Sequence, residues 1–240
     1  RDDCRPDHIE YHKFNKSVID EEVLNFAKGL DGIIIVRFPM GSRKTQGIIK
    51  PMMWEYPNSL FAAHRMSLIG GGVDALNTKP KPEDQTEQDH ILRDKMSHGF
   101  VANYQEPSIK EMMPGIQKLA WCINSILKPE FTPLLNNLDA VCIDEAAQTL
   151  RHVTSGGAIK YPVAVFNRWL ELMATTKDKV ILADADANDI LVEFCELGLK
   201  QRNAHLQALY GENVTPQKIH IIDGHTDCSD TSIYYTDSDT

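Results

Sequence analysis

The nine residues RFPMGSRKT, at positions 37–45, have the features of a loop that binds phosphate. In the usual pattern, G-x-x-x-x-G-K-[ST], backbone N–H groups and the lysine surround a polyphosphate, and the hydroxyl binds Mg²⁺. Lys44 and Thr45 keep the end of this pattern, whereas Phe38 and Arg43 occupy its two glycine positions. Taken alone, the segment is explained better by an ordinary turn between a strand and a helix, with a solvated lysine.

Two adjacent acids, Asp144 and Glu145, follow an apolar run about 100 residues after Lys44. In ATPases with a phosphate loop, an aspartate at such a strand end holds Mg²⁺, and a neighbouring acid can orient or deprotonate the attacking water. The simpler interpretation is a pair of acids stabilised by the dipole at a helix N-terminus. That interpretation accounts for the acids but not for their pairing with the lysine loop, so we favour the catalytic one.

Polar residues also follow three other apolar runs. Asp184 begins the segment DADAN, which could sense a γ-phosphate or simply cap a helix. His64 and Arg65 follow the run SLFAA, and Asn124 and Ser125 follow LAWCI. Each pair could contact a nucleic-acid backbone or merely end a strand.

The elements that must position these residues are short apolar strands and amphipathic helices. The first 16 residues show no clear period, and residues 70–90 are predicted to be an exposed excursion with one short helix. Helices are predicted at residues 17–29, with Ser17 as N-cap, and at 44–54, 163–173 and 187–197. Strands are predicted at residues 33–36, 59–63, 99–104, 119–123, 140–143, 179–183 and 218–222.

Nearly unbroken apolar strands that alternate with helices predict an α/β fold, with a mostly parallel sheet and helices on both faces. In such a sheet, ligands bind at the carboxyl ends of the strands. All the polar segments named above fall there, and this coincidence carries more weight than any single motif.

The composition limits the classes of function. The 240 residues are 42% hydrophobic and 25% charged, with a net charge of −9, which argues against a non-specific coat on DNA. The five cysteines are scattered and indicate reduced thiols, so we expect an intracellular protein, cytoplasmic or nuclear, without a membrane span. Cys4, His8 and His12 have a ligand-like spacing that is a weak zinc signal. The first residue is Arg rather than Met, so a fragment or processed product is expected.

Taken together, five segments resemble the first RecA-like lobe of superfamily-2 helicases. The resemblance is more specifically to the herpesvirus origin-binding-protein type and its relatives in plasmid and phage replication. It covers about residues 30–195, in the expected order. The segments are IIIVRFPMGSRKT, SLFAAHRMSL, LAWCINSI, AVCIDEAAQTLRHV and VILADADAN.

The resemblance implies ATP and Mg²⁺ as cofactors, and ATP-driven DNA unwinding during replication initiation as the activity. Its expected partners are single-stranded or origin DNA, and a second RecA-like lobe or other replication proteins. It implies that Thr45 and Asp144 hold Mg²⁺ and that Lys44, Asp144 and Glu145 are catalytic. Nucleotide contacts are expected from Pro39, Met40, Gly41, Ser42, Arg43, Lys44, Thr45 and Asp184, and nucleic-acid contacts from His64, Arg65, Asn124 and Ser125.

The expected organisation is an N-terminal extension with a helix (residues 1–29), a RecA-like ATP-binding lobe (30–222) and an acidic polar tail (223–240). Arg43 departs from the family pattern, because a side chain beside the phosphates crowds the backbone's approach. Two alternatives therefore stay open. One is a degenerate helicase lobe with an inactive pocket that binds nucleic acid or protein, and the other is a small-molecule phosphotransferase with a phosphate loop.

Overall fold

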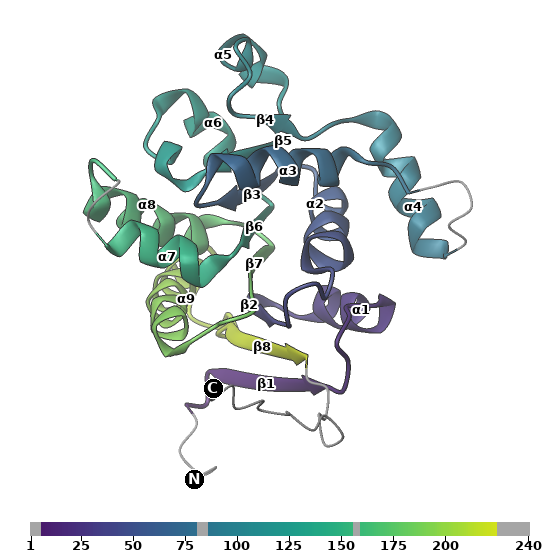
Figure 1. Ribbon diagram of the computed structural model, residues 1–240. Helices are drawn as coiled ribbons and strands as arrows, with labels where there is room; N and C mark the ends of the chain where they lie inside the picture. The colour runs from purple at the N-terminus through teal and green to yellow at the C-terminus, as the bar shows by residue number, and fades with distance from the viewer. Residues whose placement is uncertain (1–5, 81–85, 156–158, 225–240) are drawn as a thin grey trace, which may run out of the picture.

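The computed structural model describes residues 6–80, 86–155 and 159–224, which form a single eight-stranded sheet (Figure 1). Every strand pairing in it is parallel, which confirms the expected fold class. The order across the sheet is β1-β8-β2-β7-β6-β3-β5-β4. The strands are β1 (Ile9–Phe14), β2 (Gly32–Arg37), β3 (Ser59–Ala63), β4 (Ala102–Asn103), β5 (Lys118–Cys122), β6 (Ala140–Asp144), β7 (Lys179–Asp184) and β8 (Lys218–Gly224).

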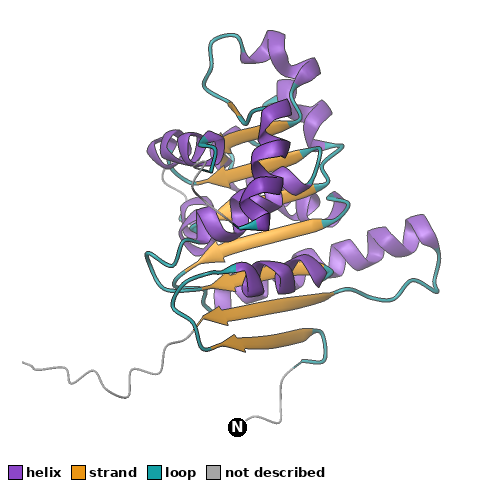
Figure 2. Cartoon of the chain, turned by 90° about the vertical axis from the view of Figure 1, so that its right-hand side faces the viewer, coloured by secondary structure: helices purple, strands orange, loops and turns teal. Residues whose placement is uncertain are grey.

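Helices cover both faces of the sheet, which is why the central strands are continuous apolar runs. One face carries α1, η1, α2 and α3, and the other carries α7, α8 and α9 (Figures 1 and 2). The helices and helical turns on these faces are α1 (Glu21–Gly29), η1 (Thr45–Ile49), α2 (Lys50–Glu55), α3 (Met66–Asn77), α7 (Ala146–Thr154), α8 (Pro162–Thr175) and α9 (Asp189–Tyr210). Helix α4 (Glu87–Lys95) packs against α2. The remaining short elements are η2 (Met96–His98), α5 (Ile109–Met112), η3 (Met113–Gly115), η4 (Ile123–Ser125), η5 (Pro129–Phe131) and α6 (Thr132–Leu135).

Several local predictions were wrong. The first 16 residues contain the strand β1, which the absence of a clear period concealed, because its pairing with β8 comes from the far end of the chain. The strand expected at 99–104 shrinks to the two residues of β4, and much of the supposed excursion at 70–90 is helical, in α3 and α4. Helix α1 begins at Glu21 because the Asp20 carboxylate, rather than Ser17, accepts a hydrogen bond from the Val23 N–H at 3.2 Å.

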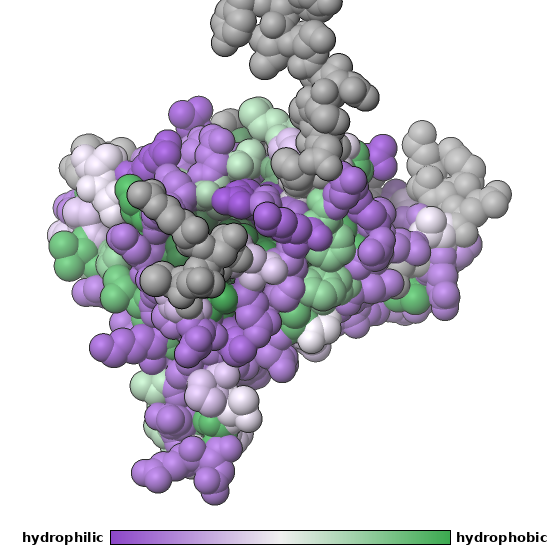
Figure 3. Space-filling view, turned by 90° about the horizontal axis from the view of Figure 1, so that it is seen from below, coloured by the Kyte–Doolittle hydropathy of each residue, from purple (hydrophilic) through white to green (hydrophobic). Residues whose placement is uncertain are grey.

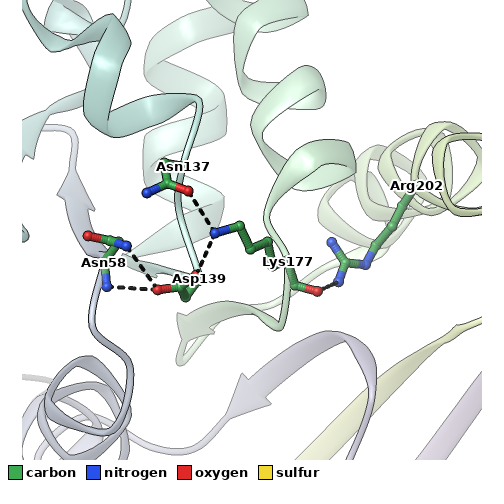
Figure 4. A network of polar contacts seen from close by, with 5 residues as sticks. All are labelled: Asn58, Asn137, Asp139, Lys177 and Arg202. Carbon is green, nitrogen blue, oxygen red and sulfur yellow. Dashed lines mark hydrogen bonds and ion pairs between the residues drawn. The ribbon is translucent and has the colours of Figure 1, made fainter. Parts of the chain in front are cut away.

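A polar network fixes the amino ends of the central strands (Figure 4). The Asp139 carboxylate accepts hydrogen bonds from the backbone N–H of Asn58 at 2.9 Å and from the ammonium of Lys177 at 3.1 Å. The Arg202 guanidinium donates to the backbone carbonyl of Lys177 at 3.1 Å and to that of Met173 at 3.0 Å. These bonds join the segments that lead into β3, β6 and β7, at the sheet edge opposite the polar segments named above.

The sheet edge formed by β1 has a polar surface. Seen from this side, the described residues are mostly hydrophilic, with hydrophobic residues in separate groups (Figure 3). A polar edge strand resists pairing with other chains. Among the described residues, no helix combines the length and the apolar character that a membrane crossing needs.

Candidate nucleotide-binding site

The order of the strands brings the polar segments of the sequence together along the carboxyl ends of the strands. Strands β2, β7, β6, β3 and β5 are neighbours in that order, and all point the same way. Their carboxyl ends therefore present, side by side, the loop at residues 38–44, Asp184, the Asp144-Glu145 pair, His64-Arg65 and Asn124-Ser125.

A hydrogen bond joins the loop to the acid pair. The Thr45 hydroxyl donates to the Asp144 carboxylate at 2.9 Å, across 99 residues of sequence. The other oxygen of Asp144 accepts from the Glu145 backbone N–H at 3.1 Å. Burial raises the pKa of Asp144, and the bond from Thr45 opposes this rise. A buried carboxylate beside a hydroxyl is a donor set that suits Mg²⁺.

The Lys44 side chain points into its own loop. Its ammonium donates to the carbonyls of Phe38 and Pro39, each at 3.0 Å, and the residue is almost fully buried. These bonds hold the positive charge at the centre of the loop, at the start of the helical segment formed by η1 and α2.

Several donors of the loop lack partners within the described residues. Ser42 is only 2% exposed, and its buried hydroxyl has no hydrogen-bond partner. The backbone N–H groups of Arg43, Lys44 and Thr45 donate to no carbonyl there either. Buried polar groups are normally satisfied, and free N–H groups at a helix start bind anions. The loop therefore fits a phosphate group.

Arg43 does not fill the loop. Its φ of +66° lies in the left-handed region, which a glycine adopts easily and other residues adopt at a cost. Its side chain is exposed and lines a cavity of about 480 Å³ together with Ile19, Gln46 and Lys50. The arginine thus strains the backbone, and its exposed side chain lines this outer cavity rather than packing against Lys44.

We therefore expect Arg43→Gly to leave ATP affinity within about fivefold of the original. The substitution removes a left-handed penalty of about 1–2 kcal/mol and adds about 0.5–1 kcal/mol of glycine chain entropy, so stability should rise by up to about 1.5 kcal/mol. Calorimetric titration with Mg-ATP and urea denaturation measure the two effects. A gain of more than about tenfold in affinity would show that the arginine obstructs the site.

Glu145 occupies a strained position beside Asp144. Its φ is +50°, which is unusual for a residue other than glycine and is typical of functional sites. Gln148 donates to its carboxylate at 2.8 Å. Burial, and then the negative charges of Asp144 and Asp184, raise the pKa of Glu145, which brings it closer to the range useful for a base.

Asp184 connects the end of β7 to the start of α7. It is fully buried, and its two oxygens accept from the backbone N–H groups of Ala147 and Asp186, both at 2.7 Å. Both bonds are to backbone, so in this structure Asp184 acts as a cap that ties the acid-pair strand to the neighbouring one. Asn188, four residues on, caps α9 through the Leu191 N–H at 3.1 Å.

A second cavity, of about 420 Å³, lies beside the acid pair. It is lined by His64 and Arg65 after β3 and by Arg151 and His152 on α7. Burial, and then the charge of Arg65, lower the pKa of His64, whose buried Nδ1 has no partner among the described residues. Asn124 lies at this edge, with its Oδ1 3.1 Å from His152 Nε2.

Ser125, like His64, is almost fully buried, whereas Arg65 and Asn124 are exposed. Ser125 is only 5% exposed, at the end of η4, and a hydrogen bond with it lowers the pKa of Tyr104 against the larger effect of burial. The sequence interpretation missed Gln148, Arg151 and His152. Arg151 and His152 lie three and four residues after Gln148, which places the three side chains on one helix face, and that periodicity was the available signal.

Asp144→Asn should raise the stability of the ligand-free protein. The folded pKa of Asp144 lies above its unfolded value, so ionisation begins to oppose folding in the pH window between these two values and opposes it fully above the folded pKa. Stability should therefore fall as the pH rises through this window in the original protein, and less so in the variant. Thermal melts across the acidic range measure the difference, with Asp94→Asn on α4 as control; equal slopes would contradict the expectation.

Only part of the expected Cys4, His8 and His12 group lies among the described residues. Cys4 lies outside them, as do residues 225–240 of the expected tail. His8 pairs with Glu196 at 2.7 Å, whereas His12 faces His220 on β8 at 3.2 Å.

No family model and no curated protein matches the chain. Among solved structures it is similar to the crystal structure of the DUF1998 helicase MrfA bound to DNA and AMPPNP, with a TM-score of 0.47 and 16% identity. The match covers 83% of this chain and 26% of that one, so the chain spans about a quarter of that protein's length.

Proposed function

We propose that this chain is the ATP-binding lobe of a DNA helicase of the superfamily-2 type. The observation that carries the proposal is the hydrogen bond of Thr45 to Asp144, beneath a loop whose lysine points inward. The spacing of these residues along the sequence is that of a phosphate loop and its metal-holding acid. If residues 37–45 were only an ordinary turn between a strand and a helix, nothing would require Thr45 to hydrogen-bond to Asp144.

Each residue has a defined task in this proposal. The free N–H groups of the loop and Lys44 bind the phosphates, and Thr45 and Asp144 hold Mg²⁺. The metal, when bound, neutralises charge on the phosphates. Glu145 accepts a proton from, or orients, the water that attacks the γ-phosphate. Asp184 keeps the start of α7, and with it Glu145, aligned with the neighbouring strand.

The role in replication initiation rests on the resemblance of the five segments to origin-binding helicases. The catalytic arginine is expected from a second RecA-like lobe, and such residues contribute about 10³-fold or more to the rate. This chain alone should therefore bind ATP but hydrolyse it slowly.

Calorimetric titration of the chain with ATP, with and without Mg²⁺, tests the proposal. We expect one site per chain, and tighter binding when the metal is present. An absence of heat at millimolar Mg-ATP, in both the original chain and Arg43→Gly, would sink the proposal and favour a lobe without nucleotide.

The cavity beside the acid pair favours binding of single-stranded DNA. It presents the exposed guanidinium groups of Arg65 and Arg151 next to the half-buried His152, on a chain that is acidic overall. A local basic patch of this kind can bind a phosphate backbone. The same observation would support the alternative function, a binding module with an inactive pocket, if ATP does not bind.

Arg151→Glu should weaken binding of a fluorescent single-stranded oligonucleotide about tenfold at low salt, because one phosphate contact becomes repulsive. Fluorescence anisotropy at several salt concentrations measures this, and the salt dependence should also become shallower. Lys13→Ala, on the exposed part of β1, is the control and should change nothing. Equal affinities of Arg151→Glu and the original would remove this cavity as the DNA site.

A further inference from the structure

Three potential metal ligands meet on β1 and β8, the two strands at one edge of the sheet. Glu10 and His12 come from β1, and His220 comes from β8, where Glu10 and His220 are direct neighbours in the register. Residues 10 and 12 share one face because side chains alternate along a strand. The chain thus brings together residues that lie 208 positions apart.

The distances between the ligand atoms match those around a single ion. His12 Nε2 lies 3.2 Å from His220 Nδ1, and Glu10 Oε2 lies 3.4 Å from His220 Nδ1 and 3.8 Å from His12 Nε2. Zinc bonds of about 2.0–2.2 Å in a tetrahedron place neighbouring ligand atoms about 3.3–3.6 Å apart. An ion can therefore sit at bonding distance from all three atoms with small shifts.

The surroundings hold the three side chains in place. The ring of Phe26 on α1 packs edge-on against His12, with ring centroids 4.8 Å apart. Lys218 binds the other oxygen of Glu10, Oε1, at 2.5 Å, which orients the carboxylate and leaves Oε2 directed at the histidines. The side chains of His12 and His220 are only 21% and 10% exposed, so the ligands are largely shielded from water.

We propose that Glu10, His12 and His220 form a zinc site that fastens the edge strand β1 to β8. Two imidazoles and a carboxylate are a set that zinc prefers, with water as the fourth ligand. The ion would take the place of the direct contact between the imidazoles. His12 would carry its proton on Nδ1, and His220 on Nε2, so that both facing nitrogens offer lone pairs. The site is independent of the proposed nucleotide site, which lies beyond the carboxyl ends of other strands.

Zinc titration of the full chain, stripped with a chelator, tests the site. Competition with a chromophoric chelator should give one zinc per chain, and Co²⁺ should produce the visible absorption of a tetrahedral complex. Zinc should also raise the melting temperature, because an ion that binds only the folded state stabilises it. His12→Gln and His220→Asn should each lower zinc affinity more than about tenfold and abolish that rise.

Variants of neighbouring residues distinguish zinc bound at these three ligands from zinc bound elsewhere on the chain. Lys218→Gln keeps a donor that can hold Glu10 Oε1 but removes the positive charge that competes with the ion, so it should tighten zinc binding by up to about fivefold. His8→Gln, which alters the histidine paired with Glu196, should bind zinc as the original does. The double variant Cys4→Ser/Cys228→Ser should also bind normally, because neither thiol belongs to the proposed set.

Two results would overturn the proposal. One is the absence of stoichiometric zinc in the original chain, which would leave the three residues as a hydrogen-bonded cluster without a metal. The other is unchanged zinc affinity in both histidine variants. Circular dichroism of each variant in chelator confirms that the fold is retained, so a failure to bind is not a failure to fold.

Discussion

Lys44→Ala is expected to weaken Mg-ATP binding by about 10- to 100-fold, the largest effect on function predicted for this chain. Hydrogen bonds to a charged group contribute about 1.5–3 kcal/mol, and Lys44 is the cation held at the centre of the loop. Its ammonium already lies within the loop, bound to the carbonyls of Phe38 and Pro39, so little reorganisation precedes its contact with phosphate. Calorimetry or fluorescence of a labelled nucleotide measures the loss.

Lys110→Ala is the matched control, since it removes an exposed lysine, paired with Glu130 at 3.8 Å, from another part of the molecule. Affinity should be unchanged in this variant. Thermal melts of Lys44→Ala show whether the fold survives without the two carbonyl bonds. If Lys44→Ala binds Mg-ATP as tightly as the original does, the loop at residues 38–45 is not the nucleotide site.

Arg202→Ala is expected to destabilise the protein by about 3–5 kcal/mol, the largest effect on stability. The guanidinium is fully buried and donates to the carbonyls of Met173, Thr176, Lys177 and Asp178, and to the Gln217 side chain at 2.5 Å. Truncation leaves these buried acceptors unsatisfied and opens a cavity. Burial also lowers the pKa of Arg202, but a guanidinium stays charged at neutral pH.

Urea denaturation measures this loss as a shift of the midpoint. Lys200→Ala, an exposed position two residues earlier on α9, should change stability by less than about 0.5 kcal/mol. Arg202→Lys should recover only part of the stability, because an ammonium cannot reach carbonyls on several sides as the planar guanidinium does. A loss below about 1 kcal/mol for Arg202→Ala would mean that the carbonyls find water or other donors.

The two predictions concern opposite ends of the strands in one sheet. The bonds of Arg202 and Asp139 fix the amino ends of the central strands (Figure 4). The loop and the acid pair lie at the carboxyl ends. Arg43 and Glu145, the non-glycine residues with positive φ among those described, both lie at the carboxyl edge. Strain of this kind costs about 1–3 kcal/mol for each residue and persists only where the surrounding structure holds the backbone in place.

The sequence by itself determined the central strands and the polar segments that follow them. The runs IIIV and VCI are short, apolar and followed by charged residues, so hydrophobic patterning alone specifies β2 and β6 and their order along the chain. The parallel fold class follows from the same patterning, because strands buried on both faces need helices on both sides. Local composition was sufficient wherever the burial of a segment did not depend on a distant partner.

Only the tertiary structure decided which of those segments meet. Strand order across the sheet brings Thr45 to Asp144, and it brings His12 to His220. The outward position of the Arg43 side chain likewise became visible only in the folded chain. A half-polar strand such as β1 has no strong pattern of its own, and it forms because β8 supplies its hydrogen-bond partners. Contacts between residues 99 or 208 positions apart are fixed by the packing of the whole sheet, which local sequence patterns do not encode.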